Sequence, residues 1–165
     1  LREAGYTGLT IGIETGDDKA LAFMNKGYAA QDVIVQCARL DAANIAYAFF
    51  YLAGISGKGC GIEGARITAA VCNQTHPSLI GANMLTIYKN SELYQEIITG
   101  NWEEETEIEK YQEIKALVKD LEIPVEFAML GASNPVMLQG RLPEQRAQIV
   151  ATLDRVIEEL SLIHI

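Results

Sequence analysis

Short apolar segments that recur at even intervals constrain the fold of this chain most. Four of them have the length and composition of buried β-strands, namely residues 9–13, 45–53, 79–87 and 124–130. Their centres lie roughly 35 to 45 residues apart, and each interval holds a helical pattern, which is the spacing of right-handed β-α-β crossovers. Four such units are half of an eight-unit barrel. We therefore predict an α/β fold, the second half of a partial (β/α) TIM-like barrel with parallel strands.

The intervals show the periodicity of amphipathic helices. A short helix is predicted after Asp17 and Asp18, and longer ones over residues 31–44, 62–75, 91–99, 106–122 and 143–160. In residues 106–122 the apolar side chains share one face, so the charged residues are expected to form a solvated outer face. Residues 131–142 are predicted to be a long loop, and Leu1 to Gly5 resembles the last turn of a helix with its glycine cap.

Length and charge limit the classes of partner. The 165 residues are read as one domain, and 13 basic against 22 acidic side chains give a net charge of −9. Such an acidic chain is not expected to bind nucleic acid or an anionic membrane surface. The longest apolar run, residues 45–55, is far shorter than the roughly 20 residues that span a bilayer. We expect a soluble, cytoplasmic protein without nucleic-acid or membrane partners.

The cysteines and histidines are too few and too scattered for a metal centre. Cys37, Cys60 and Cys72 contain no CxxC pair, and His76 and His164 are the only histidines. No disulfide framework, zinc site or other metal site is therefore predicted. Cys37 is expected in the core. Cys60 is expected in an exposed loop, where no basic partner marks it as a nucleophile.

Glu14 is the first candidate ligand-binding residue. Ligands of parallel α/β folds meet the carboxyl ends of the strands, and Glu14 directly follows the first strand. The alternative is that Glu14 caps the following helix, although Asp17 or Asp18 would suffice for that purpose.

The glycine-rich stretch over residues 54–61, after the second strand, is the second candidate. Gly59, Gly61 and Gly64 satisfy the GxGxxG pattern of NAD- or FAD-binding proteins, but no acidic residue ends the next strand. The stretch would also serve as a backbone platform for a flat ligand group, because glycine permits close approach. The third interpretation is a mobile turn without a ligand.

Several motifs resemble those of radical S-adenosylmethionine enzymes. Residues 12–16 (GIETG) and 24–27 (MNKG) are similar to a strand end and a turn of that superfamily, and residues 51–59 are similar to its later glycine-rich strand end. Residues 84–88 with 93–94 resemble another strand of the superfamily. Residues 133–134 with 140–143 resemble the tail of an uncharacterised iron–sulfur oxidoreductase-like branch. The resemblance extends over residues 1–160 in order.

The resemblance implies an enzyme that cleaves S-adenosylmethionine at a 4Fe-4S cluster and forms a 5′-deoxyadenosyl radical. Glu14 would then hold the ribose hydroxyls. The adenine contacts would be Gly54, Ile55, Ser56, Gly57, Leu85 and Thr86. An electron donor and a small-molecule or unidentified substrate would be the partners, and the catalytic residues stay unassigned.

The chain departs from the family pattern in ways that limit this expectation. The cysteines cannot reproduce the CxxxCxxC loop, so the cluster ligands are expected upstream of Leu1. Leu130 and Pro135 stand where the branch has a histidine and a tyrosine. We thus expect residues 1–160 to be the carboxyl-terminal part of such a barrel, inactive alone, and residues 161–165 to be a non-native tail that includes His164. The alternatives are a dinucleotide-binding α/β protein and a non-catalytic interaction domain.

Overall fold

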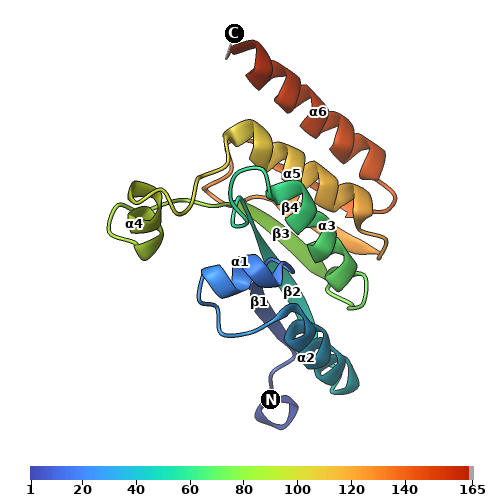
Figure 1. The fold of residues 1–165 in the computed structure, drawn as a ribbon. Coiled ribbons are helices and arrows are strands. Elements are labelled where there is room, and N and C mark those ends of the chain that lie inside the picture. Colours follow the sequence, from blue (N-terminus) through green and yellow to red (C-terminus); the bar gives the residue numbers. More distant parts are fainter. Residues whose placement is uncertain (164–165) are drawn as a thin grey trace.

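The fold is a five-stranded sheet with helices packed on one face (Figure 1). The computed structural model describes residues 1–163. The sheet order is β1-β2-β3-β4-β5, and the first four strands are parallel, as predicted. The strands are β1 (Gly8–Glu14), β2 (Ala46–Ala53), β3 (Leu79–Met84), β4 (Val125–Met129) and β5 (Leu138–Leu142).

The helices fall close to the predicted segments, and several begin at recognisable caps. The Asp17 side chain caps α1, and Thr106 with Glu109 forms a capping box at the start of α5. Gly5 has the expected left-handed cap conformation, with φ 85°. The elements are η1 (Arg2–Ala4), α1 (Asp18–Phe23), α2 (Ala30–Ala42), α3 (Gly61–Cys72), α4 (Glu92–Ile98), α5 (Glu107–Asp120) and α6 (Arg146–Ile163).

The two faces of the sheet differ in burial. Along β2, Tyr47, Phe49 and Tyr51 are buried, and they pack into one core with side chains of α2, α3, α5 and α6. The other side chains of β2 point to the opposite face of the sheet, among them Ala48 and Phe50. Phe50 is 42% exposed there and lies beside Gly12 of β1 and Gly81 of β3 in the strand register. We call this side of the sheet the open face.

The strand β5 corrects the predicted loop over residues 131–142. It pairs antiparallel with β4 and covers that edge of the sheet. Leu138, Gly140 and Leu142 are the alternate residues of β5 that face the core. Because the middle one is a glycine, the apolar alternation of a strand is hard to see in the sequence. A Cβ at Gly140 would lie 3.0 Å from the Ile149 side chain of α6, so packing against the helix explains the glycine.

The carboxyl-terminal helix is longer than expected. Helix α6 continues through Ile163, so residues 161–163 of the predicted tail extend a regular helix. His164 and Ile165 lie outside the described residues. Among the helices of residues 1–163, we find none with the length and apolar character that crossing a membrane requires.

Candidate functional site

The carboxyl end of β1 is anchored to helix α3. Thr15 is 1% exposed and its hydroxyl lies 3.1 Å from that of Thr68, which also accepts a 2.7 Å hydrogen bond from the Gly16 amide. A Cβ at Gly16 would stand 2.8 Å from the Thr68 Cα, so only glycine allows this close approach. The anchor fixes the backbone immediately after Glu14.

Glu14 itself adopts an unusual backbone conformation. Its φ is 60°, and the Thr15 amide donates a 2.7 Å hydrogen bond to the Ile13 carbonyl, which defines a γ-turn of the strained type. Strained backbone of this kind persists where the surroundings impose it and is concentrated at functional sites. The turn directs the carboxylate over the open face, where Oε1 lies 3.0 Å from the Cβ position of Gly12.

The structure contradicts the capping alternative for Glu14. Asp17 caps α1 by accepting a 2.9 Å hydrogen bond from the Lys19 amide, and Asp18 accepts one of 2.7 Å from the Ala30 amide. The Glu14 carboxylate pairs instead with Lys26, at 3.2 Å. Both side chains remain partly exposed, so the carboxylate is accessible to a ligand.

The predicted residues after β2 and β3 lie at the same end of the sheet as Glu14, the carboxyl end of the parallel strands. Ser56 donates a hydrogen bond of 3.3 Å to Asp17 in the loop after β1, and the Leu85 amide donates one of 2.9 Å to Ala53 at the end of β2. Leu85 is half-buried and Thr86 is exposed. Three neighbouring strand ends thus contribute predicted site residues.

The remaining predicted residues are covered in this structure. Gly54, Ile55 and Gly57 are buried, and both glycines have positive φ, 93° and 80°. A Cβ at Gly57 would lie 2.7 Å from Nε1 of Trp102, which belongs to the connection between α4 and α5. Ser56 is the partly exposed member of this group, and its hydroxyl lies against Gly64 of α3, where a Cβ would clash with Oγ.

A buried network of carboxyl groups lies under the glycine-rich loop, residues 54–61. Oε2 of Glu113 accepts a 2.8 Å hydrogen bond from the Gly54 amide, and Oε1 accepts one from the Tyr51 hydroxyl. Glu105 accepts a 2.9 Å bond from the Gly61 amide. The two carboxylates are neighbours, because a single Cβ placed at Gly61 would clash with both.

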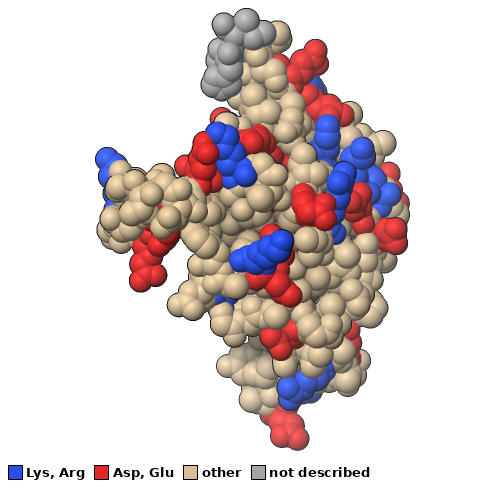
Figure 2. Space-filling model, in the orientation of Figure 1, with Lys and Arg blue, Asp and Glu red and all other residues tan. Residues whose placement is uncertain are grey.

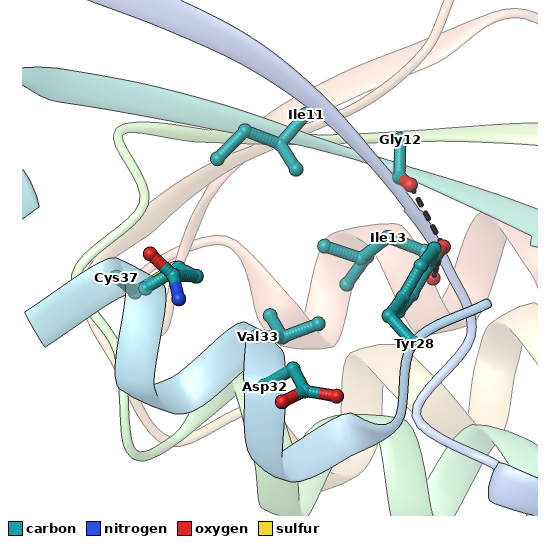
Figure 3. A pocket seen from close by; sticks show the side chains of 8 residues that line it. Ile11, Gly12, Ile13, Tyr28, Asp32, Val33 and Cys37 are labelled. Atoms are coloured by element: carbon teal, nitrogen blue, oxygen red, sulfur yellow. Dashed lines mark hydrogen bonds between the residues drawn. The ribbon is translucent and has the colours of Figure 1, made fainter. Parts of the chain in front are cut away.

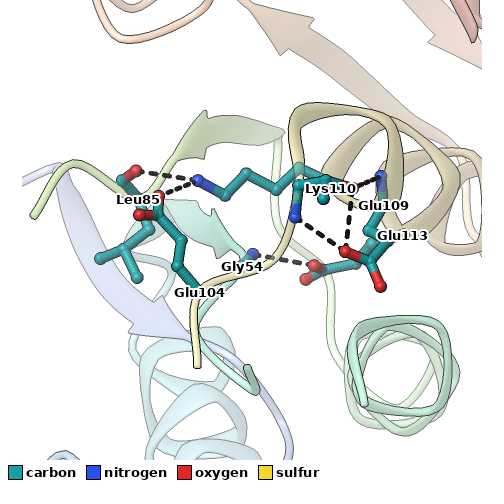
Figure 4. A network of polar contacts seen from close by, with 7 residues as sticks. Gly54, Leu85, Glu104, Glu109, Lys110 and Glu113 are labelled. Carbon is teal, nitrogen blue, oxygen red and sulfur yellow. Dashed lines mark hydrogen bonds and ion pairs between the residues drawn. The ribbon is translucent and has the colours of Figure 1, made fainter. Parts of the chain in front are cut away.

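Lys110, on helix α5 together with Glu113, is a further buried charged residue beside this network (Figure 4). Its ammonium lies 2.6 Å from the Glu104 carboxylate and 3.4 Å from the Leu85 carbonyl, and its side chain is only 8% exposed. Lys110 and Glu113 correct the prediction that the charged residues of α5 are all solvated. The sequence contained an indication of this burial, because Lys110 has helical spacing with Ile114 and Leu117 and therefore shares their buried face.

Burial changes the acid–base properties of the network. Desolvation raises the pKa of Glu113 well above its usual range, and the hydrogen bond with Glu105 raises it further. Desolvation also raises the pKa of Glu105, although the hydrogen bonds that it accepts from Glu113 and from the Gly61 amide act to lower it. These directions describe a pair in which Glu113 keeps its proton and donates it toward the Glu105 carboxylate.

The GxGxxG pattern does not form a phosphate site in this fold. Dinucleotide-binding proteins place the pyrophosphate at the helix N-terminus, where backbone amides are free. At the start of α3 the Gly61 amide already donates to the Glu105 carboxylate, which is 4% exposed. An acidic group fills the position that an anionic ligand would need, which weighs against the dinucleotide alternative.

A separate apolar pocket of about 180 Å³ lies between β1 and α2 (Figure 3). Side chains of Ile11, Ile13, Val33 and Cys37 line it, and the Tyr28 ring closes one end by donating to the Gly12 and Ile13 carbonyls. The Tyr28 end of the pocket adjoins the backbone of Ile13, directly before Glu14. The sequence patterns did not indicate this pocket.

The thiols and the surface charges complete the description. Cys37 and Cys72 are buried and Cys60 is exposed, as expected for Cys37 and Cys60. Within residues 1–163, no group of three or more His, Cys, Asp or Glu side chains is placed to hold a metal ion. On the face that Figure 2 shows, basic and acidic side chains are interspersed and do not gather into fields of one sign.

The comparisons with known proteins bear on the fold. No protein-family model matches the chain, and no curated protein does. A solved structure of the archaeal Elp3 from Methanocaldococcus infernus, with residues 1–46 deleted, is similar with a TM-score of 0.69 and 15% identity. The similarity covers 97% of this chain and 38% of that one. The α/β fold with a mostly parallel sheet is thus shared with part of a longer chain.

Proposed function

We propose that this chain supplies the adenosyl-binding edge of a radical S-adenosylmethionine enzyme. The adenosyl site consists of Glu14, Ser56, Leu85 and Thr86, with Gly54, Ile55 and Gly57 beneath them. The observation that carries the proposal is the Glu14 carboxylate, which a strained γ-turn holds over the open face at the carboxyl end of β1. A carboxylate in this place can accept hydrogen bonds from both ribose hydroxyls.

The shape of the edge supports a flat ligand group next to that carboxylate. Ser56 follows β2, the neighbour of β1, and Leu85 and Thr86 follow β3, the next strand in the sheet, so a ribose at Glu14 would place the base toward them. The open face continues from there with Phe50, an exposed aromatic ring between two glycines. This surface offers an apolar floor for the part of a substrate that faces the nucleoside.

The structural likeness to Elp3, a member of the radical S-adenosylmethionine superfamily, agrees with the proposal at the level of fold. The described residues do not fit a four-iron cluster, because Cys37 and Cys72 are in the core and Cys60 is exposed and apart from them. We propose that the cluster ligands come from residues outside this chain. The chain's own contribution is then nucleoside binding and the substrate floor.

Titration of the ¹⁵N-labelled chain with 5′-deoxyadenosine tests this function. We expect amide shifts at Thr15, Ser56, Leu85 and Thr86, and much weaker binding of 2′,3′-dideoxyadenosine, which lacks both ribose hydroxyls. NAD⁺ serves as the competing ligand. Shifts that NAD⁺ causes at residues 59–64, without any response to 5′-deoxyadenosine, would support the dinucleotide alternative and contradict the proposal.

A further inference from the structure

We propose that Lys110 and Glu113 of α5 are positioning residues for the adenosyl site. Each of them binds the backbone of one of the two segments that would contact the adenine, and neither needs to touch the ligand. The inference rests on the proposed function, because it concerns the geometry of that same site.

Glu113 holds the segment after β2. Its Oε2 accepts the 2.8 Å hydrogen bond from the Gly54 amide, and its other oxygen accepts from the Tyr51 hydroxyl. Glu113 is 0% exposed, so water does not compete for these bonds. The carboxyl group thus fixes where the chain leaves β2 and turns into the glycine-rich loop.

Lys110 holds the segment after β3. Its ammonium reaches the Leu85 carbonyl at 3.4 Å, and Glu104 balances its charge at 2.6 Å. The aliphatic part of the side chain also lies directly on Gly54, where a Cβ would stand 2.7 Å from Cε. Lys110 therefore contacts both segments and sets how closely they approach.

The two residues act from one rigid support. They are three positions apart on α5, so both point to the same side of the helix. Ile114, Leu117 and Val118 of that helix are 0% exposed and pack into the core. Burying the Lys110 ammonium and the polar carboxyl group of Glu113 is costly in free energy, and apolar side chains would fill the same space more favourably. Retention of a lysine and a glutamate at these positions is explained if they fix the two segments.

The test compares Lys110→Met with Lys119→Met in the full chain. Methionine keeps the aliphatic packing on Gly54 but removes the ammonium, and Lys119 is an exposed lysine of the same helix. We expect Lys110→Met to weaken 5′-deoxyadenosine binding at least tenfold and to shift the Leu85 and Thr86 amides in the free protein. Lys119→Met should change neither.

Conservative replacement at Glu113 separates positioning from general stability. Glutamine keeps an acceptor for the Gly54 amide, so Glu113→Gln should retain binding, whereas Glu113→Leu should lose it. Thermal unfolding of each variant shows which proteins are folded at the temperature of the titration. The Lys110→Met result decides the question if Glu113→Leu does not fold.

The outcomes distinguish the inference from the function on which it rests. If the wild type binds 5′-deoxyadenosine and folded Lys110→Met binds it equally well, the positioning role is wrong and the proposed function stands. If the wild type shows no binding, the proposed function fails and the positioning role fails with it. Loss of binding in Lys110→Met with retention in Lys119→Met and Glu113→Gln supports both.

Discussion

The amide of Gly54 and the carboxyl group of Glu113, 59 residues apart in sequence, are joined by a buried 2.8 Å hydrogen bond. The neighbouring carboxylate, Glu105, binds the Gly61 amide at the other end of the same loop. Both ends of the glycine-rich loop are therefore held by two adjoining buried carboxyl groups. This arrangement links the protonation of the pair to the stability of the loop.

Replacement of Glu113 by glutamine should reduce the pH dependence of stability. The folded-state pKa of Glu113 is raised, so its contribution is complete below its unfolded pKa and is lost as pH rises through the folded value. The wild type should thus lose free energy of unfolding as pH rises above about 4.3, the ordinary pKa of a glutamate. Glutamine resembles the protonated acid. The free energy of unfolding of Glu113→Gln, measured by urea denaturation, should therefore fall less steeply between pH 5 and pH 8 than that of the wild type.

The matched control is Glu107→Gln, which changes an exposed carboxylate on the same helix. Its pH dependence should follow that of the wild type. Identical slopes for wild type and Glu113→Gln would show that Glu113 does not keep its proton in the folded protein, which contradicts a raised pKa for this carboxyl group.

The three thiols should differ sharply in reactivity. Burial raises the pKa of Cys37 to about 11 and that of Cys72 to about 12, so at pH 8 their thiolate fractions are on the order of one part in a thousand or less. Cys60 is exposed. A chromogenic disulfide should label one thiol quickly in the native protein, and Cys60→Ser should remove that phase. Fast labelling of a second thiol would mean that the core opens readily.

The chain should associate through the outer edge of β1. That edge has no neighbouring strand among the described residues, and an uncovered edge is a template for pairing. The Ala46 amide donates to the Thr7 carbonyl, so the alternation of a parallel ladder turns the Thr10 amide outward. Thr10→Pro should therefore weaken association and preserve the β1–β2 ladder, as measured by sedimentation.

Thr10→Val is the control for that substitution, because valine keeps the amide and should associate like the wild type. If the wild-type chain sediments as a monomer at all accessible concentrations, association through the edge of β1 is contradicted.

The sequence contained enough information for the parallel strands but not for every element. Residues 45–53 are apolar on both sides and lie between clear helical patterns, so the strand that became β2 was predictable. Residues 138–142 alternate only weakly, because Gly140 takes the place of a larger apolar side chain under Ile149. Because position 140 has no apolar side chain, the alternation typical of a strand is not visible in the sequence, and β5 was predicted as a loop.

The candidate site was predictable in part for a related reason. Strand order alone predicted that Glu14 and the glycine-rich stretch follow strands, whereas Ser56 and Leu85 were assigned only through the family resemblance. Their ligand-binding roles stay predictions. The buried partners were not predicted, because Glu105 and Glu113 reach the glycine-rich loop through contacts between segments more than 40 residues apart. The burial of Ile55 and Gly57 depends on Trp102 and on packing, which motif spacing does not encode.

The adenosyl site depends above all on Glu14, so the affinity of Glu14→Gln for 5′-deoxyadenosine is the decisive quantity. Charge-assisted hydrogen bonds to the ribose hydroxyls are worth roughly 1.5 to 3 kcal/mol, which corresponds to about a tenfold to hundredfold loss of affinity. Stability should change little, because the ion pair with Lys26 is partly exposed. Glu126→Gln is the matched control, since Glu126 lies on the same open face, with Arg141 at 4.0 Å, near the amino end of β4 and away from the carboxyl ends of the strands.

Isothermal titration or amide-shift titration gives the three dissociation constants under one set of conditions. We expect Glu14→Gln to bind 5′-deoxyadenosine at least tenfold more weakly than the wild type, and Glu126→Gln to bind it equally well. An unchanged dissociation constant for Glu14→Gln would contradict the ribose-binding role and with it the proposed adenosyl site.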